Sequence, residues 1–181
     1  MSARPREAAR RALDLGRRRL PGRTRGAKAE AAREPSASPF AGTGTRVLLV
    51  DDEEPLRVVC RLNLELAGLE VTEAADGEQA LAAIAAERPD IILLDVMMPR
   101  LDGWEVAAQL AADETTRELP IVFLSARTAP EDRRRAVDAG GIGYIVKPFD
   151  PLALPGRLQT MLERMRRGER DALRREALEG L

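Results

Sequence analysis

The 181-residue sequence contains no histidine, and this absence excludes several common kinds of site. Catalytic triads with a histidine base, zinc sites with histidine ligands and histidine phosphoacceptors all need the missing residue. Cysteine is nearly absent too: Cys60 is the single one, so no intramolecular disulfide can form and a reducing compartment is favoured. We interpret Cys60 as a structural residue on a helix. Any chemistry must therefore use carboxylates, lysine and hydroxyl groups.

Long hydrophobic runs are missing as well. No stretch approaches the roughly 18 apolar residues of a membrane-spanning helix, and the N-terminus has no apolar signal core. We therefore expect a cytoplasmic protein that does not insert into membranes.

Charge is balanced overall but unevenly distributed. Residues 1–44 hold 11 Lys and Arg against four Asp and Glu, with much Pro, Gly, Ala and Ser, whereas the whole chain has a formal net charge of -1. Such a composition cannot bury enough apolar surface to offset the entropy of ordering. We expect a disordered basic arm at 1–44, a folded domain at 45–167 and a charged helical C-terminal extension at 168–181.

The body of the chain alternates short apolar runs with helical patterns. We predict an α/β fold, a doubly wound parallel sheet of five strands covered on both faces, because the strands are apolar throughout. The expected strands are 47–50, 69–74, 91–94, 121–124 and 144–147, and the expected helices are 55–67, 77–86, 103–112, 130–139 and one from 151 onward.

Polar side chains follow four of the five predicted strands. Asp51 and Asp52 come after the first strand, Asp95 after the third and Ser125 after the fourth, while Lys147 ends the fifth. Parallel strands deliver their carboxyl ends to one edge of the sheet, where ligands collect. Taken singly, the two aspartates could cap a helix, the serine could be a loop hydroxyl and the lysine a solvated strand end. Their convergence favours a shared site.

Three crowded carboxylates repel one another unless cations lie among them. The lysine supplies one charge, and an all-oxygen ligand set suits Mg²⁺, or Mn²⁺ in its place. Metal, lysine, hydroxyl and a carboxylate nucleophile are the parts that phosphoryl transfer needs.

Four motifs together resemble the receiver domain of two-component response regulators, in order and spacing, over about residues 46–167. They are VLLVDDEEPLR, DIILLDVMMPRLDGWEV, PIVFLSA and AGGIGYIVKPFDP. The resemblance implies a flavodoxin-like (βα)5 fold with strand order 2-1-3-4-5. It implies a phosphorylation-dependent switch that receives its phosphoryl group from a sensor histidine kinase or a phosphotransfer protein.

The resemblance also implies residue roles. Asp95 would accept the phosphoryl group. Asp51, Asp52, Asp95 and the backbone carbonyl of Met97 would hold Mg²⁺. Ser125 and Lys147 would contact the phosphoryl group.

Further positions concern the response to phosphorylation. Ser125 and Tyr144 would form the switch, and Met97 and Arg127 would tune the phosphoryl lifetime. Gly141, Ile142 and Gly143 lie where the family more often has a small residue and acidic residues, so we expect a loop there that is more flexible and less charged than usual.

The segment GERDALRREALEGL after the last predicted helix contains no recognition helix or second core. A DNA-binding output domain needs roughly 60 to 100 further residues. We therefore expect a stand-alone regulator that acts through a protein partner on the face of the fourth helix, fifth strand and fifth helix, without nucleic acid. It would catalyse only its own phosphorylation and dephosphorylation. The alternatives are a phosphorylation-independent scaffold, a nucleic-acid-binding regulator that uses the basic arm, and a Mg²⁺ phosphatase.

Overall fold

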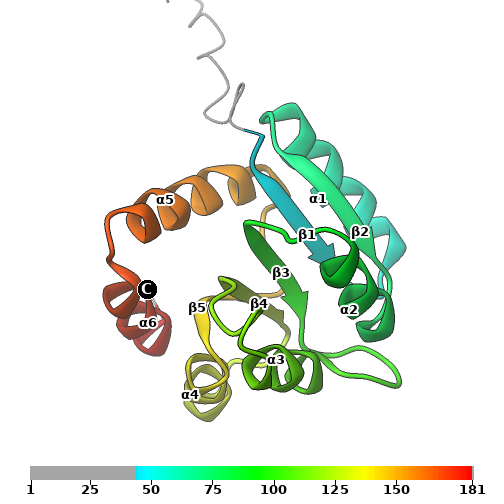
Figure 1. Ribbon diagram of the computed structural model, residues 1–181. Coiled ribbons are helices and arrows are strands. Elements are labelled where there is room, and N and C mark those ends of the chain that lie inside the picture. The colour runs from blue at the N-terminus through cyan, green and yellow to red at the C-terminus, as the bar shows by residue number, and fades with distance from the viewer. Residues whose placement is uncertain (1–43, 181) are drawn as a thin grey trace, which may run out of the picture. The chain divides into compact units, whose positions relative to one another are not determined.

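Five parallel strands form one sheet in the order β2-β1-β3-β4-β5 (Figure 1). The computed structural model describes residues 44–180. Along the chain these residues form β1 Arg46–Val50, α1 Glu54–Leu66, β2 Glu70–Ala74, α2 Gly77–Ala86, β3 Ile91–Asp95, α3 Gly103–Ala112, β4 Ile121–Ser125, α4 Pro130–Asp138, β5 Gly141–Val146, a 3-10 turn Pro151–Ala153, α5 Leu154–Arg166 and α6 Arg170–Glu179. Every strand pair is parallel. The predicted fold class and strand order are confirmed.

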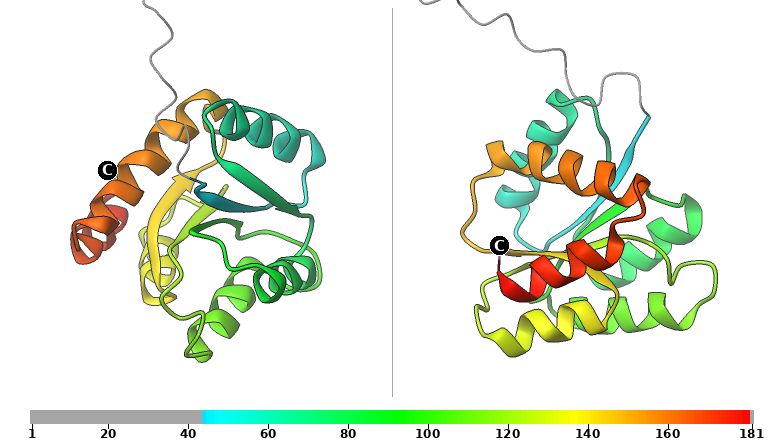
Figure 2. Two further views of the ribbon diagram at one scale, coloured as in Figure 1. Left: turned by 45° about the horizontal axis from the view of Figure 1, so that its top comes forward. Right: turned by 90° about the vertical axis from the view of Figure 1, so that its left-hand side faces the viewer.

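Two apolar clusters lie on the two faces of the sheet. One joins α1 and α5 to the sheet, and the other joins α2, α3 and α4 to the opposite face, as the left view of Figure 2 shows. All the side chains of β3 and β4 are buried, which explains why these strands are apolar up to their last residue. Each fully buried aliphatic side chain contributes about 1.5–3 kcal/mol through removal from water.

The fifth strand differs from the prediction. It begins at Gly141 rather than at residue 144, and it ends at Val146, one residue before Lys147. Gly141 and Gly143 pair with β4, with a register shift between Ile121 and Val122, so the expected flexible loop is wrong. Glycine is depleted in strands, which hid this start in the sequence. A Cβ atom at position 143 would lie 2.9 Å from the terminal methyl carbon of Met161, so the glycine lets α5 approach the strand.

The start of α3 fixes the backbone next to β3. Asp102 and Glu105 form a reciprocal capping box, in which each side chain accepts a hydrogen bond from the other's backbone N–H. Gly103, the first residue of the helix, lies so close that a Cβ there would be 2.2 Å from the carbonyl oxygen of Asp95. Only glycine fits this close approach, and the helix start therefore holds the end of β3 in place.

The structure describes the C-terminal end of the chain almost completely and the N-terminal end only from residue 44. Residues 1–43, which make up the expected basic arm except for its last residue, lie outside the described residues. Residue 181 lies outside them as well. Within 44–180, no helix combines the length and apolarity required to cross a bilayer. The segment expected as a charged extension contains α6, whose residues Leu173 and Ala177 are buried against the rest of the domain.

Candidate phosphoryl-transfer site

Three aspartates gather at the carboxyl edge of the sheet. One carboxylate oxygen from each of Asp51, Asp52 and Asp95 lies within 4.8 Å of the other two. Asp51 is 0% and Asp95 3% exposed, whereas Asp52 is exposed. The first two follow β1 and the third ends β3, and these two strands are neighbours in the sheet. The predicted convergence of these residues is thus present in the structure.

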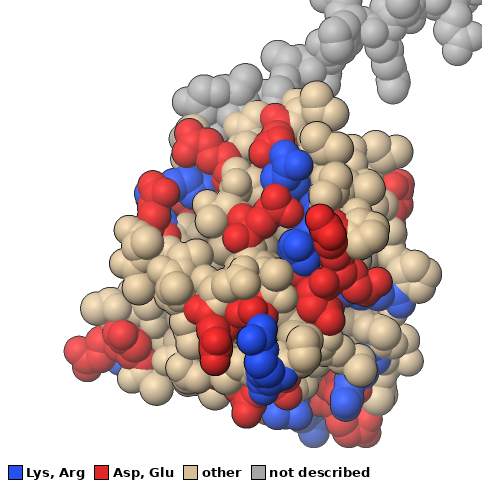
Figure 3. All heavy atoms as spheres, turned by 90° about the vertical axis from the view of Figure 1, so that its right-hand side faces the viewer, with Lys and Arg blue, Asp and Glu red and all other residues tan. Residues whose placement is uncertain are grey.

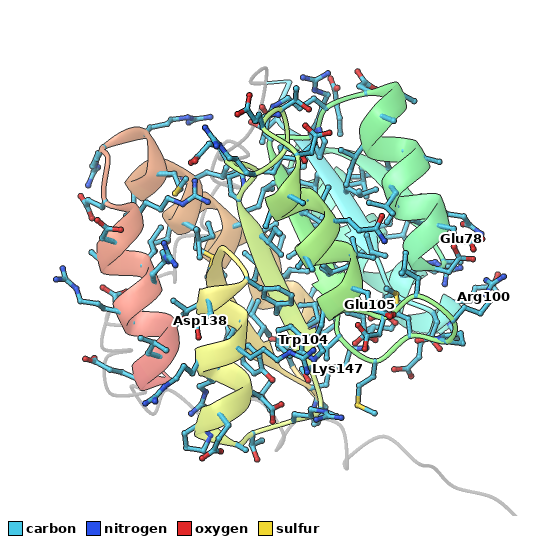
Figure 4. The ribbon with its side chains drawn as sticks, turned by 60° about the horizontal axis from the view of Figure 1, so that its bottom comes forward. Glu78, Arg100, Trp104, Glu105, Asp138 and Lys147 are labelled. Atoms are coloured by element: carbon cyan, nitrogen blue, oxygen red, sulfur yellow. The ribbon has the colours of Figure 1, made fainter. Side chains whose placement is uncertain are left out.

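Lys147 lies among these carboxylates, just beyond the end of β5. Its Nζ atom is 2.7 Å from Oδ2 of Asp51 and 2.6 Å from Oδ2 of Asp95. Figure 4 brings this edge of the sheet forward and labels Lys147 on it. Burial acts to lower the pKa of the Lys147 ammonium, but the two carboxylates outweigh burial, so the pKa is raised above its ordinary value. Burial raises the pKa of Asp51, against the opposing effect of Lys147. The lysine is therefore held as a cation between two buried acids.

Backbone N–H groups hold the other carboxylate oxygens. Oδ1 of Asp95 accepts a hydrogen bond from the Met97 N–H at 2.9 Å, and Oδ1 of Asp51 accepts one from the Glu53 N–H at 3.0 Å. The side chain of Met97 itself is 54% exposed. These contacts fix both carboxylates in the turns after their strands, so that Oδ2 of each faces the lysine.

Ser125, Arg127 and Tyr144 form a second group next to the carboxylates. The Ser125 side chain is fully buried at the end of β4, and its hydroxyl accepts a hydrogen bond from the Arg127 N–H at 3.1 Å. The Tyr144 hydroxyl donates to the Arg127 carbonyl at 3.0 Å. Burial raises the pKa of Tyr144, and the nearby Ser125 side chain opposes that rise. The backbone of Arg127 links the two residues expected to form the switch.

The sequence prediction missed two residues at this site. Glu53 lies 3.3 Å from Nζ of Lys147 and adds a third, more exposed carboxylate around the ammonium. Arg57 donates from Nη1 to the Asp51 carbonyl at 2.7 Å, and its Nε pairs with Glu73 on β2. Glu53 could have been found because it directly follows the two aspartates. No pattern in the sequence indicated Arg57, because its contacts depend on how α1 packs against the sheet.

The donor set fits a hard divalent cation. Its three carboxylates offer oxygen ligands within one small volume, and oxygen is the ligand that Mg²⁺ prefers. Although Nζ of Lys147 is close, Oδ2 of Asp51 accepts no hydrogen bond of normal geometry. A buried carboxylate oxygen without a hydrogen bond has a lone pair with which it can coordinate a metal ion. The exposed carboxylate of Asp52 leaves one side open to water, as a partly hydrated Mg²⁺ requires.

An open hollow of ≈ 500 Å³ adjoins the site. Its lining includes Asp52, Met97 and Arg127. Trp104 also lines it, with its ring centroid 4.9 Å from that of Phe123 and the guanidinium of Arg135 4.7 Å above its face. This hollow beside Asp52 offers room for a phosphoryl donor group.

Comparison with known proteins identifies relatives for most of the described chain. The family model of the response regulator receiver domain matches residues 47–159. The phosphate regulon transcriptional regulatory protein PhoB of Pseudomonas aeruginosa is 40% identical over 129 residues, which are 71% of this chain and 56% of that protein. The response regulator MprA of Mycolicibacterium vanbaalenii is 44% identical over 119 residues, covering 66% of this chain and 51% of the relative. The chain thus spans about half the length of the curated relatives it matches.

Solved structures agree with these relatives. The chemotaxis protein CheY4 of Vibrio cholerae superposes with a TM-score of 0.61 at 37% identity, covering 65% of this chain and 98% of that one. A response regulator structure from Chloroflexus aurantiacus gives a TM-score of 0.62 at 34% identity, covering 66% and 98%.

Proposed function

The chain belongs to the response regulator receiver family of two-component systems, and on this premise we propose that Asp95 accepts a phosphoryl group and thereby switches the domain between two states. Receiver domains interact with histidine kinases or phosphotransfer proteins, which would supply the phosphoryl group. The observation that supports the proposal most is the Lys147 ammonium held 2.6 Å from the Asp95 carboxylate and 2.7 Å from that of Asp51. A structural role alone does not require two buried acids around one lysine.

In the proposed reaction, a carboxylate oxygen of Asp95 attacks the phosphorus of a phosphohistidine. The P–O bond forms, the P–N bond breaks, and the leaving imidazole retains the electron pair and takes up a proton. Oδ1 of Asp95 is fixed by the Met97 N–H, so the carboxylate is already oriented. Lys147 would transfer its hydrogen bond from Asp95 to the phosphoryl oxygens, whose growing charge it neutralises.

Receiver domains bind Mg²⁺ at an acidic pocket, and we propose that Asp51, Asp52, Asp95 and the Met97 carbonyl form that pocket here. When bound, Mg²⁺ supplies positive charge that stabilises the phosphoryl oxygens in the transition state. The protein's own part is to hold the acids close together and to keep one of them, Asp52, open to solvent. Mn²⁺ fits the same oxygen ligands.

The switch would operate through Ser125 and Tyr144. A phosphoryl group adds roughly -1.5 to -2 charges at neutral pH and strong hydrogen-bond acceptors. The Ser125 hydroxyl would rotate toward it and give up its present contact with the Arg127 N–H. Since Tyr144 bonds to the same loop, its ring would follow. Moving such an equilibrium from 1:99 to 99:1 takes about 5.5 kcal/mol of differential stabilisation. Met97 and Arg127 would set how fast water removes the group.

For the output we propose a protein partner on the face of α4, β5 and α5. A second candidate follows from the relatives, because PhoB is named a transcriptional regulatory protein and RpaA of Synechocystis a DNA-binding regulator. The domain would then control a DNA-binding activity. On the face shown in Figure 3, acidic and basic side chains are interspersed rather than separated by sign, so this face offers no basic patch for phosphates. DNA binding by the full chain that weakens steeply with salt would favour the second candidate over the first.

The test is intact-mass analysis after incubation with acetyl phosphate and Mg²⁺. The wild-type chain should gain the mass of one phosphoryl group, and EDTA should abolish the gain. The Asp95→Asn variant is nearly isosteric and should gain nothing, whereas the matched control Asp90→Asn, a change at the opposite end of β3, should behave like the wild type. If Asp95→Asn takes up the phosphoryl group as well as the wild type does, the proposed phosphoacceptor is wrong.

A further inference from the structure

The last described helix, α6, lies on the surface formed by α4, β5 and α5. After α5 the chain turns at Gly168, whose φ of 77° is in the left-handed region that favours glycine. The right view of Figure 2 shows α6 between α5 and α4, in front of β5, and contacts join α6 to all three elements. We name the surface beneath it the α4-β5-α5 face.

Apolar packing attaches the middle of α6 to this face. Leu173 and Ala177 are 4% and 7% exposed, and their spacing of four residues places them on one side of the helix. Leu173 belongs to the same apolar cluster as Ile142 of β5 and Leu158 of α5. The helix therefore buries its apolar side in the domain core and is not a solvated appendage.

Charged contacts attach α6 to its two neighbouring helices. Arg164 of α5 makes two contacts with the Glu176 carboxylate, at 2.6 and 2.8 Å. On the other side, Arg174 donates to the Val137 carbonyl at 2.8 Å. The carbonyls at the end of α4 carry the negative end of the helix dipole, which favours a cation there.

Two of the three elements under α6, β5 and α4, connect to the phosphoryl-transfer site. β5 contains Tyr144 and leads into Lys147, whose Nζ is 2.6 Å from Asp95. The loop before α4 contains Arg127, which is bonded to both Ser125 and Tyr144. Covalent and hydrogen-bonded contacts therefore lead from Asp95 to the surface on which α6 lies.

A hollow of ≈ 640 Å³ lies between α6 and the α4-β5-α5 face, and its lining includes Ala177 of α6 and Tyr144 of β5. α6 is therefore attached through a small number of apolar and charged contacts rather than by continuous close packing. Because Tyr144 lines this hollow, a movement of its ring changes the space beneath α6.

We propose that α6 is a built-in cover of the α4-β5-α5 face, and that phosphorylation of Asp95 weakens its attachment and exposes that face to a partner. The proposal rests on the phosphoacceptor function proposed above and adds a mechanism of regulation to it. Coupling is reciprocal, so weakening the attachment of α6 also favours the phosphorylated state.

Thiol labelling of an Ala177→Cys variant of the full chain tests the cover. The new thiol would be buried under α6, while the native Cys60 is 0% exposed and stays protected. Beryllofluoride with Mg²⁺, a mimic of the phosphoryl group, should raise the labelling rate about fivefold or more, the lower end of ordinary allosteric coupling. The matched Asp171→Cys variant has an exposed thiol on the same helix, and its rate should stay unchanged. Adding Asp95→Asn should abolish the response.

Two outcomes separate the cover from the phosphoacceptor function. If acetyl phosphate adds one phosphoryl group to the Ala177→Cys variant but neither it nor beryllofluoride changes the labelling rate, the cover is refuted and the phosphoacceptor function stands. If no phosphoryl group is added and the rate does not change, both are refuted. A Glu176→Gln change should raise the labelling rate several-fold without any phosphoryl mimic, and the exposed Glu179→Gln change should not.

Discussion

Replacing Lys147 by methionine should destabilise the domain by an amount that depends on pH. The substitution keeps an unbranched side chain and removes the charge between Asp51 and Asp95, which are 0% and 3% exposed. At 2.7 Å, one such pair has a gross attraction of about 6 kcal/mol at an effective dielectric constant of about 20. Desolvation offsets part of it, and removing one partner of a buried pair typically costs about 3–5 kcal/mol.

Protonation of Asp51 or Asp95 limits the loss of stability in the Lys147→Met variant. An orphaned carboxylate can take up a proton, at a cost of about 1.36 kcal/mol per pH unit above its ordinary pKa of 3.8. At pH 7 this limit is about 4.4 kcal/mol for one proton, and at pH 5 it is about 1.6 kcal/mol. The sign follows from the raised carboxyl pKa of the variant: the penalty is present above the raised pKa and disappears as pH falls toward the ordinary value.

Urea unfolding at pH 7 and pH 5, with EDTA present, measures this loss. At a slope of about 2 kcal/mol per M urea, a loss of about 4 kcal/mol lowers the midpoint by about 2 M at pH 7 and by less than 1 M at pH 5. Arg157→Met is the control, because Arg157 is exposed on α5, and its effect should stay within about 0.5 kcal/mol. Adding Asp51→Asn to Lys147→Met should recover part of the loss. Equal losses at both pH values would refute the electrostatic reasoning and assign the loss to packing.

Three further predictions concern other parts of the domain. Burial raises the pKa of the Cys60 thiol to about 11, so Cys60 should resist Ellman's reagent at pH 8 until the protein is unfolded in urea. Gly103→Ala should cost about 1–3 kcal/mol in urea unfolding because of its contact with the Asp95 carbonyl, whereas Gly156→Ala, with open space around it, should gain about 0.4–1 kcal/mol. The Arg164 contact lowers the pKa of Glu176, so the contribution of this ion pair to the attachment of α6 is complete above the ordinary glutamate pKa and is lost as pH falls through the lowered value; the protection of α6 amides from hydrogen exchange should decrease only there.

The sequence predicted those strands well that are buried on both faces of the sheet. The runs before Asp51, Asp95 and Ser125 are apolar because β1, β3 and β4 are covered on both faces, and this pattern located both the strands and the residues that follow them. The start of β5 escaped prediction because its glycines are explained by tertiary contacts: Gly141 lies against Phe123 and the carbonyl of Ala136, and Gly143 lies against Met161.

The candidate site was predictable to the extent that topology determines it. Parallel strands bring Asp51, Asp95 and Lys147 to one edge, whatever the details of packing. Arg57 could not be found in this way, since its bond to the Asp51 carbonyl depends on how α1 is rotated. The packing of α6 was equally hidden, because two buried residues in a charged helix are too weak a pattern to indicate which surface they cover. The roles assigned to Met97 and Arg127 stay predictions.

The stacking of Arg135 on Trp104 makes the tryptophan an intrinsic fluorescence probe of the position of α4. Trp104 is the single tryptophan of the chain, and its ring contacts Phe123 on the sheet and lies under the guanidinium of Arg135 on α4. Indole emission responds to a nearby cation, so a displacement of α4 by even a few ångströms changes the emission of the unlabelled protein. Each movement of that helix can therefore be timed in a stopped-flow instrument, with Arg135→Gln as the variant in which the signal is lost.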